Sequence, residues 1–162
     1  MAAMTTSGTA KVTLPTDEQI LITQKFDAPK DLVFRAWTTP ELVRRWWTAK
    51  RGEMKVAEID LRVGGKWRYA MVTPDGMEVG FHGEYREIVP NERLVSTEVY
   101  EGMPDAEAVN TLTLTETDGR TTLEVLVQHQ TKEHRDGHVE SGMEEGMQDA
   151  MDLLEEVAVS LR

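Results

Sequence analysis

Apolar and polar residues alternate along most of the chain from Glu53 to Gln130, which is the pattern of half-buried strands. We predict six strands there, at residues 53–60, 66–73, 78–89, 93–101, 108–117 and 121–130. Turn-forming residues such as Gly64-Gly65 and Pro74-Asp75-Gly76 separate them. A weaker alternation over residues 11–27 predicts one further strand before them. The expected sheet is therefore seven-stranded and antiparallel.

The dipeptide Asp118-Gly119 predicts a two-residue hairpin turn and so fixes the register of the last two strands. Thr117 then pairs with Arg120, and residues that pair across strands share a face. One face collects apolar residues, whereas the other is mostly threonine and polar residues. The apolar face is expected to hold Leu112, Leu114, Leu123, Val125, Val127 and His129. The pattern predicts a sheet with one buried side.

Helical patterns occur at two places. Asp27-Ala28-Pro29 starts a short helix, and Thr39-Pro40 ends it and starts a second one. Residues 138–161 repeat apolar positions at intervals of three and four, which predicts a long amphipathic helix. Such a helix buries its stripe best against the apolar face of the sheet. We expect an α+β domain at residues 11–162, with the curved sheet wrapped around the C-terminal helix and two short helices between the first and second strands. Residues 1–10 are expected to be a flexible leader.

Composition narrows the function classes. The net charge of −11 disfavours nucleic acid as a partner, because phosphate backbones are also negative. No apolar run approaches the ~20 residues of a membrane span, so no membrane insertion is expected. The absence of cysteine excludes disulfides and thiolate chemistry and fits a cytoplasmic location. No cofactor is predicted, since no phosphate loop or dinucleotide motif is present. A homodimer through the edges or outer face of the sheet is left open.

Four groups of residues, taken in order, carry a family resemblance. They are Phe26-Asp27-Ala28-Pro29 with Val33-Phe34-Arg35-Ala36-Trp37, then Trp46-Trp47, then Asp60-Leu61-Arg62-Val63-Gly64-Gly65-Lys66-Trp67-Arg68-Tyr69, and finally Gly83-Glu84-Tyr85-Arg86-Glu87-Ile88-Val89-Pro90 running into Arg93-Leu94-Val95. Over residues 18–161 the chain resembles the START-like/birch-allergen-like (SRPBCC) superfamily, in the branch similar to the C-terminal domain of the heat-shock-protein-90 ATPase activator.

The resemblance implies a helix-grip fold with a cavity between the sheet and the last helix. Members of the superfamily bind lipids, sterols, hormones or polyketides, and some are aromatase/cyclase enzymes. This chain departs from the pattern at two places. The family often has Gly-Trp in the last helix, where this chain has Gly142-Met143 and Gly146-Met147. Glu98 stands where a tryptophan is frequent, so the identity of the ligand cannot be carried over.

Two apolar series are candidates for the lining of that cavity. Met143, Met147 and Met151 lie on one helix face, and flexible methionines adapt to varied apolar shapes. Trp67, Tyr69 and Met71 alternate on one strand and so share a face. Ordinary core packing is the competing interpretation of both series. The full predicted lining is Trp67, Tyr69, Met71, Leu112, Val125, Met143, Met147 and Met151.

No catalytic residue is assigned, because the chain lacks a nucleophile motif. Glu98, His129 and Tyr69 are the candidates for acid–base work if they line the cavity, and His82 is a weaker one. Each of them has hydrogen-bonded structure or packing as its alternative. His134 and His138 have metal-ligand spacing, but Gly137 interrupts the pattern and no metal site is predicted. Of the adjacent Trp46 and Trp47, at most one is expected to be fully buried.

Three functions remain. The first is non-catalytic binding of a small, mostly apolar molecule between the sheet and the helix. The second is an enzyme of the polyketide cyclase/aromatase type, which requires that at least two of the acid–base candidates converge in one cavity. The third, ranked below both, is a module that docks to a chaperone.

Overall fold

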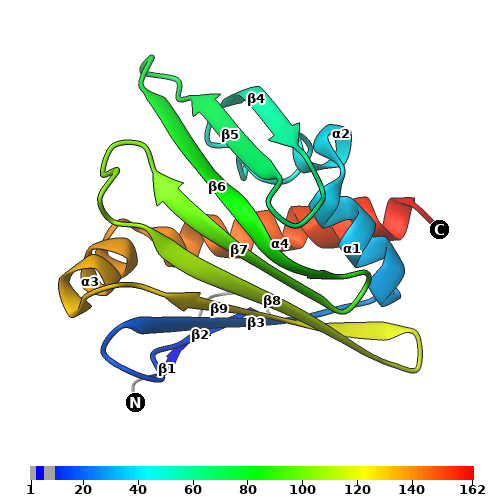
Figure 1. The fold of residues 1–162 in the computed structure, drawn as a ribbon. Coiled ribbons are helices and arrows are strands. Elements are labelled where there is room, and N and C mark those ends of the chain that lie inside the picture. The colour runs from blue at the N-terminus through cyan, green and yellow to red at the C-terminus, as the bar shows by residue number, and fades with distance from the viewer. Residues whose placement is uncertain (1–2, 6–9) are drawn as a thin grey trace.

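A nine-stranded antiparallel sheet forms most of the molecule in the computed structural model, which describes residues 3–5 and 10–162. Its strands are β1 Ala3–Thr5, β2 Lys11–Thr13, β3 Gln19–Phe26, β4 Glu53–Ile59, β5 Lys66–Val72, β6 Glu78–Val89, β7 Arg93–Tyr100, β8 Ala108–Thr117 and β9 Arg120–Gln128. They lie in the order β1-β2-β3-β9-β8-β7-β6-β5-β4 (Figure 1). Strands β4 to β9 form a meander, because each of them pairs with the next one in the chain.

The six strands predicted between residues 53 and 130 are confirmed to within two residues at each end. The hairpin register is also confirmed, since Thr117 pairs with Arg120 and Leu112 pairs with Val125. Asp118 and Gly119 both have positive φ, 54° and 77°, as this type of turn requires. A single dipeptide therefore places every side chain of β8 and β9 on its face.

The N-terminal part of the sheet differs from the expected seven strands. The strand predicted at residues 11–27 is split into β2 and β3, and β1 pairs with β2 to extend the edge. Pro15 lies in the break, where its lack of an amide proton prevents a continuous ladder. Of the expected leader at residues 1–10, residues 1–2 and 6–9 lie outside the described part.

Four helices complete the described chain. Helices α1 (Lys30–Thr38) and α2 (Pro40–Val43) lie between β3 and β4, as predicted. The single helix predicted at residues 138–161 is wrong at its start, since α3 (Lys132–Glu140) and α4 (Met143–Ser160) are separate. Gly142, with φ of 85°, makes the break, because a left-handed residue ends a helix. The Thr131 side chain accepts a hydrogen bond from the His134 amide and caps α3.

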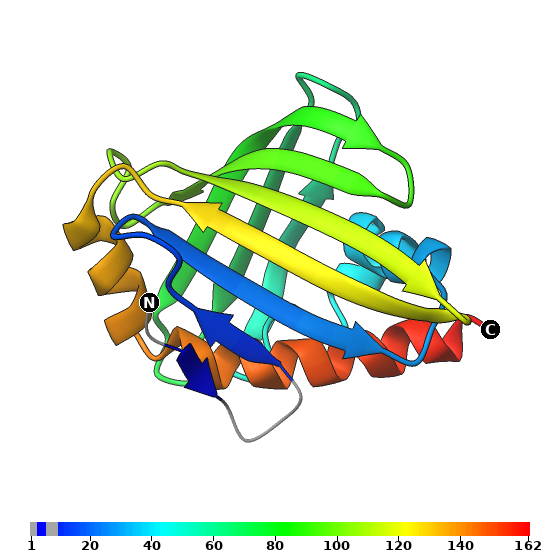
Figure 2. The ribbon, with the colours of Figure 1, turned by 90° about the horizontal axis from the view of Figure 1, so that it is seen from below.

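Helix α4 runs along one face of the curved sheet, with α1 beside its C-terminal part (Figures 1 and 2). The helix-grip arrangement predicted from the sequence is confirmed. The core lies between the two layers and includes Phe26, Val33, Leu123, Leu154 and Ala158, none of which has exposed surface. Among the residues described, no helix combines the length and apolar character that a membrane crossing requires.

Candidate functional site

The interior between sheet and helix is closely packed at one side. Inward-facing residues of β3, β8 and β9 are buried there against the C-terminal part of α4. We call this side the filled half, and its residues are Ile20, Ile22, Leu112, Leu123, Val125 and Leu154. Leu112 and Val125, both predicted to line a ligand cavity, pair with each other here and belong to the core.

Toward β5, β6 and β7 the inward-facing side chains are not all buried, because Phe81, Ser96 and Glu98 keep solvent-accessible surface, whereas four others are buried, namely Trp67, Tyr69, Tyr85 and Leu94. The register fixes their direction, because Phe81 pairs with Tyr69, and Ser96 pairs with both Tyr85 and Asn110. From the helix side, Met143 and Met147 pack against the core but are only half-buried. We call this side the open half, and its residues are Phe81, Ser96, Glu98, Asn110, Met143 and Met147.

Glu98 is the carboxyl group of the open half. It lies on the same face as Leu94 and Ser96, and Asn110 donates a side-chain hydrogen bond to it. Loss of water around the carboxyl raises the pKa of Glu98, and the hydrogen bond from Asn110 opposes this only in part. The Asn110 Oδ1 atom is buried and has no hydrogen-bond donor. Both groups are polar atoms that the protein itself leaves incompletely paired.

Two tyrosines join this polar cluster. Burial raises the pKa of Tyr69 well above its usual value, and nearby Tyr85 and Glu98 raise it further. Burial likewise raises the pKa of Tyr85. Both phenols therefore stay protonated and able to donate hydrogen bonds over the physiological range. Two of the three acid–base candidates, Glu98 and Tyr69, lie on the same face of the sheet.

A row of aromatic rings borders the cluster. The Trp67 and Tyr69 centroids are 4.8 Å apart, Trp47 lies 5.4 Å from Tyr69, and Phe81 lies 5.6 Å from Trp47. Trp67 Nε1 donates to the Thr97 carbonyl oxygen at 3.2 Å. The row leaves one large apolar surface beside the polar groups.

This position of Trp67 depends on Gly83. A Cβ atom at Gly83 would lie 2.6 Å from Trp67 Nε1 and closer still to the backbone of Thr97. Only a residue without a side chain lets the indole cross strand β6 there.

The adjacent tryptophans have different surroundings. Trp46 is 4% exposed and donates from Nε1 to the Ala36 carbonyl oxygen at 3.0 Å, so it holds α1 against the segment after α2. Trp47 is only partly buried and contacts the aromatic row.

Of the other predicted lining residues, Met151 is buried in the core and Met71 is half-buried at the end of β5.

His129, the third acid–base candidate, contacts α3. Its Nε2 atom lies 3.0 Å from His138 Nδ1, and the rings meet edge to face. Burial, and then the neighbouring His138, His134 and Arg135, lower the pKa of His129 to about 4. Burial also lowers the pKa of His138. In the described part of the chain, no group of three or more His, Cys, Asp or Glu side chains is arranged to hold a metal ion.

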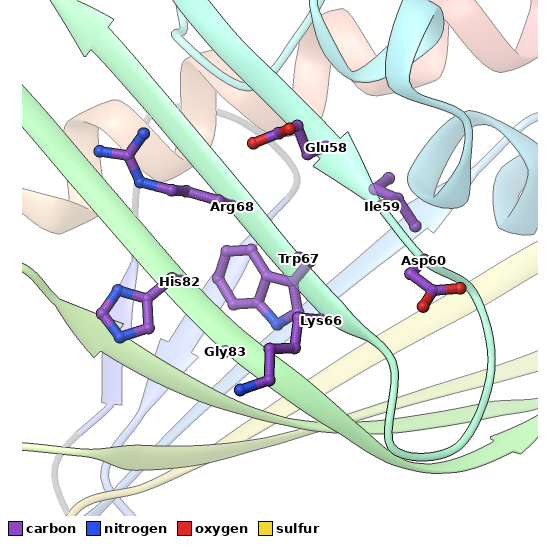
Figure 3. A pocket seen from close by; sticks show the side chains of 8 residues that line it. All are labelled: Glu58, Ile59, Asp60, Lys66, Trp67, Arg68, His82 and Gly83. Carbon is purple, nitrogen blue, oxygen red and sulfur yellow. The ribbon is translucent and has the colours of Figure 1, made fainter.

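A depression of about 510 Å³ lies on the other, outer face of the sheet (Figure 3). Arg68 and His82 pair across β5 and β6 and point outward there. Both contact Glu101, through bonds of 2.8 Å from Arg68 Nη2 and 2.9 Å from His82 Nδ1. These two partners lower the pKa of Glu101 to about 2. The depression is open, and Arg68 and His82 in it are already paired with Glu101.

Sequence reasoning did not single out Asn110 or Tyr85 as site residues, and of Trp46 and Trp47 it predicted only that at most one is fully buried. Asn110 carried a usable signal, because the hairpin register already placed this amide opposite Val127 on the apolar face. Tyr85 and Trp47 could not be placed in the same way. Tyr85 lies beside a bulge in β6, and Trp47 reaches the sheet from a separate segment.

Comparisons with known proteins agree with this architecture. The family model described as "Activator of Hsp90 ATPase homolog 1-like protein" matches residues 27–158. A crystal structure from Rhodobacter sphaeroides is 25% identical, with a TM-score of 0.86, and the match covers 93% of this chain and 99% of that one. One from Nitrosomonas europaea is 25% identical, with a TM-score of 0.82 and coverage of 91% and 97%. The comparison with curated proteins finds no match.

Proposed function

The chain belongs to the family of Activator of Hsp90 ATPase homolog 1-like proteins, and we propose that it binds a small, mostly apolar molecule between its sheet and helix α4. The ligand would lie in the open half of the interior. Its apolar body would contact Met143, Met147 and the aromatic row, and its polar end would face Glu98 and Asn110. No chemical step is part of this function.

One observation carries the proposal: the inward-facing side chains of the filled half are buried, whereas six others under the sheet are only partly buried, namely Phe81, Ser96, Glu98, Asn110, Met143 and Met147. A fully packed core would bury both sets equally, because protein interiors are as dense as organic crystals. Surface that solvent reaches under the sheet is surface that an apolar ligand can cover. The polar groups nearby would set the orientation of such a ligand.

The affinity for a simple probe can be bounded. An aromatic ligand that loses roughly 200 Å² of apolar surface gains about 5 kcal/mol at ~25 cal/mol per Å². The freedom lost on association makes binding weaker than this figure, whereas contacts that area burial does not count make it stronger. We therefore expect 2-naphthalenemethanol to bind with a dissociation constant of roughly 0.1–1 mM.

Isothermal titration calorimetry of 2-naphthalenemethanol with a blocking variant tests the site. Ser96→Phe places a ring into the open half, whereas Val95→Phe adds the same ring on the opposite face of β7. We expect Ser96→Phe to abolish binding and Val95→Phe to retain it, with both variants folded by thermal melting. Equal binding by both variants would place the ligand elsewhere, and no binding by the wild-type protein would refute the proposal.

A second function, acid–base catalysis on a bound carbonyl compound, is favoured by the convergence of Glu98 and Tyr69. A carboxyl group with a raised pKa beside a protonated phenol can remove a proton from carbon while the phenol polarises a carbonyl. The test is deuterium exchange at the methyl group of 2-acetylnaphthalene, followed by NMR in D₂O. Catalysis predicts faster exchange with the wild-type protein and none above background with Glu98→Gln. Equal exchange rates with the wild-type protein and with Glu98→Gln would refute catalysis by Glu98 and leave ligand binding as the proposed function.

A further inference from the structure

The polar end of the open half has no positive charge to balance its carboxyl group. Among the described residues whose side chains point inward from β4 to β9, none is lysine or arginine. Arg93, on the same strand as Glu98, pairs with Thr113 on the outer face and forms an ion pair with Glu87. Arg68 also points to the outer face and is engaged by Glu101. Glu98 receives a hydrogen bond only from the neutral amide of Asn110. On the helix side, Arg51 packs against Gly146 and pairs with Glu145 and Asp149. Among the described residues, an ionised Glu98 therefore lacks a cationic partner.

The side-chain oxygen of Asn110 also lacks a hydrogen-bond donor. The Asn110 side chain uses its amino group toward Glu98, and its Oδ1 atom has no partner although it is buried. A buried acceptor without a donor carries a free-energy penalty that a donor from outside can remove. Two acceptors, one of them a carboxyl oxygen, thus lie side by side.

Aromatic rings border these acceptors. Tyr69 lies close enough to Glu98 for the carboxyl charge to raise the pKa of its phenol, and Trp67 and Trp47 contact the Tyr69 ring. The faces of such rings attract cations, most strongly where water is excluded. A carboxylate, a free carbonyl oxygen and aromatic faces all favour the same kind of group, a positively charged donor.

We propose that the molecule held in the open half is an apolar amine, bound as its ammonium ion with the charge beside Glu98 and Asn110 and the apolar body against Met143 and Met147. This inference rests on the proposed function and names the chemical class of its ligand. A carboxylate would bring a second negative charge to a site without cations. A neutral alcohol would satisfy Asn110 but leave the charge of Glu98 unbalanced. The net charge of −11 also attracts cations to the molecule.

Three probes with one shape separate these classes. 2-Naphthylmethylamine, 2-naphthalenemethanol and 2-naphthoate carry the same ring system with a positive, neutral or negative group. Titration calorimetry near pH 8 should rank the amine first, about tenfold tighter than the alcohol, with the carboxylate weakest. The preference for the amine should shrink as the pH is lowered, because protonation of Glu98 removes its charge.

Glu98→Gln tests the residue directly. We expect this variant to lose the tenfold preference for the amine and its pH dependence while it still binds the alcohol. Glu124→Gln is the matched control, since Glu124 is exposed on the outer face of β9 and its loss changes the net charge equally. That control should behave as the wild-type protein does.

The outcomes are distinct. Equal binding of amine and alcohol, or tightest binding of 2-naphthoate, would overturn the amine assignment and leave the proposed function intact. Failure of all three probes to bind the wild-type protein would remove the proposed function as well. If Glu98→Gln does not fold, the pH dependence of the wild-type preference decides, and a preference that is constant with pH contradicts the proposal.

Discussion

Acidification should destabilise the protein through His129, and the size of the effect can be worked out from the structure. His129 is 9% exposed and its ring contacts the His138 ring of α3, whereas its Nδ1 atom has no hydrogen-bond partner. A second positive charge is disfavoured there because buried Arg135 is adjacent. Burial and these neighbours lower the pKa of His129 to about 4, from 6.5 in an unfolded chain.

The sign follows from the number of protons bound in each state. Between about pH 6.5 and pH 4 the unfolded chain holds a proton on His129 that the folded protein lacks, so stability falls as the pH falls. At about 1.4 kcal/mol for each pH unit, the full loss below pH 4 is about 3 kcal/mol. At pH 5 the same relation gives a loss of about 2 kcal/mol relative to pH 7.5. The lowered pKa of His138 adds a loss in the same direction.

Urea denaturation at about pH 7.5 and about pH 5 measures this difference. The loss of unfolding free energy should be smaller in His129→Gln than in the wild-type protein by about 2 kcal/mol. His82→Gln is the control, because His82 is exposed on the outer face and contacts Glu101 rather than α3. An identical loss in the wild type and His129→Gln would refute the account of this cluster.

Four further substitutions have expected results that denaturant unfolding can check. Gly119→Ala should lower the free energy of unfolding by about 1 kcal/mol, because φ of 77° is strained for alanine. Gly137→Ala in α3 should raise the free energy of unfolding by up to ~1 kcal/mol, since no atom lies near the added Cβ. Gly83→Ala should cost ~1–3 kcal/mol by displacing Trp67, and unchanged stability would contradict the close approach. Glu98→Gln should become more stable relative to the wild type as the pH rises, because the raised pKa of Glu98 reflects a penalty on its charged form. If the difference in unfolding free energy between the two proteins is the same at all pH values, the carboxyl charge of Glu98 is not buried.

The sequence predicted the sheet well because its signals are local. Strict alternation and the Asp118-Gly119 turn determine β8 and β9 without information from the rest of the chain. The break at Gly142 was also visible as a glycine, but the apolar spacing continues across it and predicted one helix. The extra strands β1 and β2 are three residues each, too short for periodicity to be informative.

The candidate site was less predictable because it depends on pairings between distant residues. Alternation placed Trp67 and Tyr69 on one face, and Glu98 on a face with Leu94, but only the strand order brings these strands together. The division into a filled and an open half depends on how far side chains from α4 reach. Nothing in the spacing of the methionines distinguishes buried Met151 from half-buried Met147.

The central claim is that an apolar molecule occupies the open half, and the methionine methyl groups report on it directly. A titration of methyl-labelled protein with 2-naphthalenemethanol should shift the NMR signals of Met143 and Met147 and give contacts between ligand and methyl protons. Met77 and Met103, which are 58% and 53% exposed and lie in loops of the sheet, serve as internal references and should not move. Shifts confined to these exposed methionines, or none at all, would contradict the account.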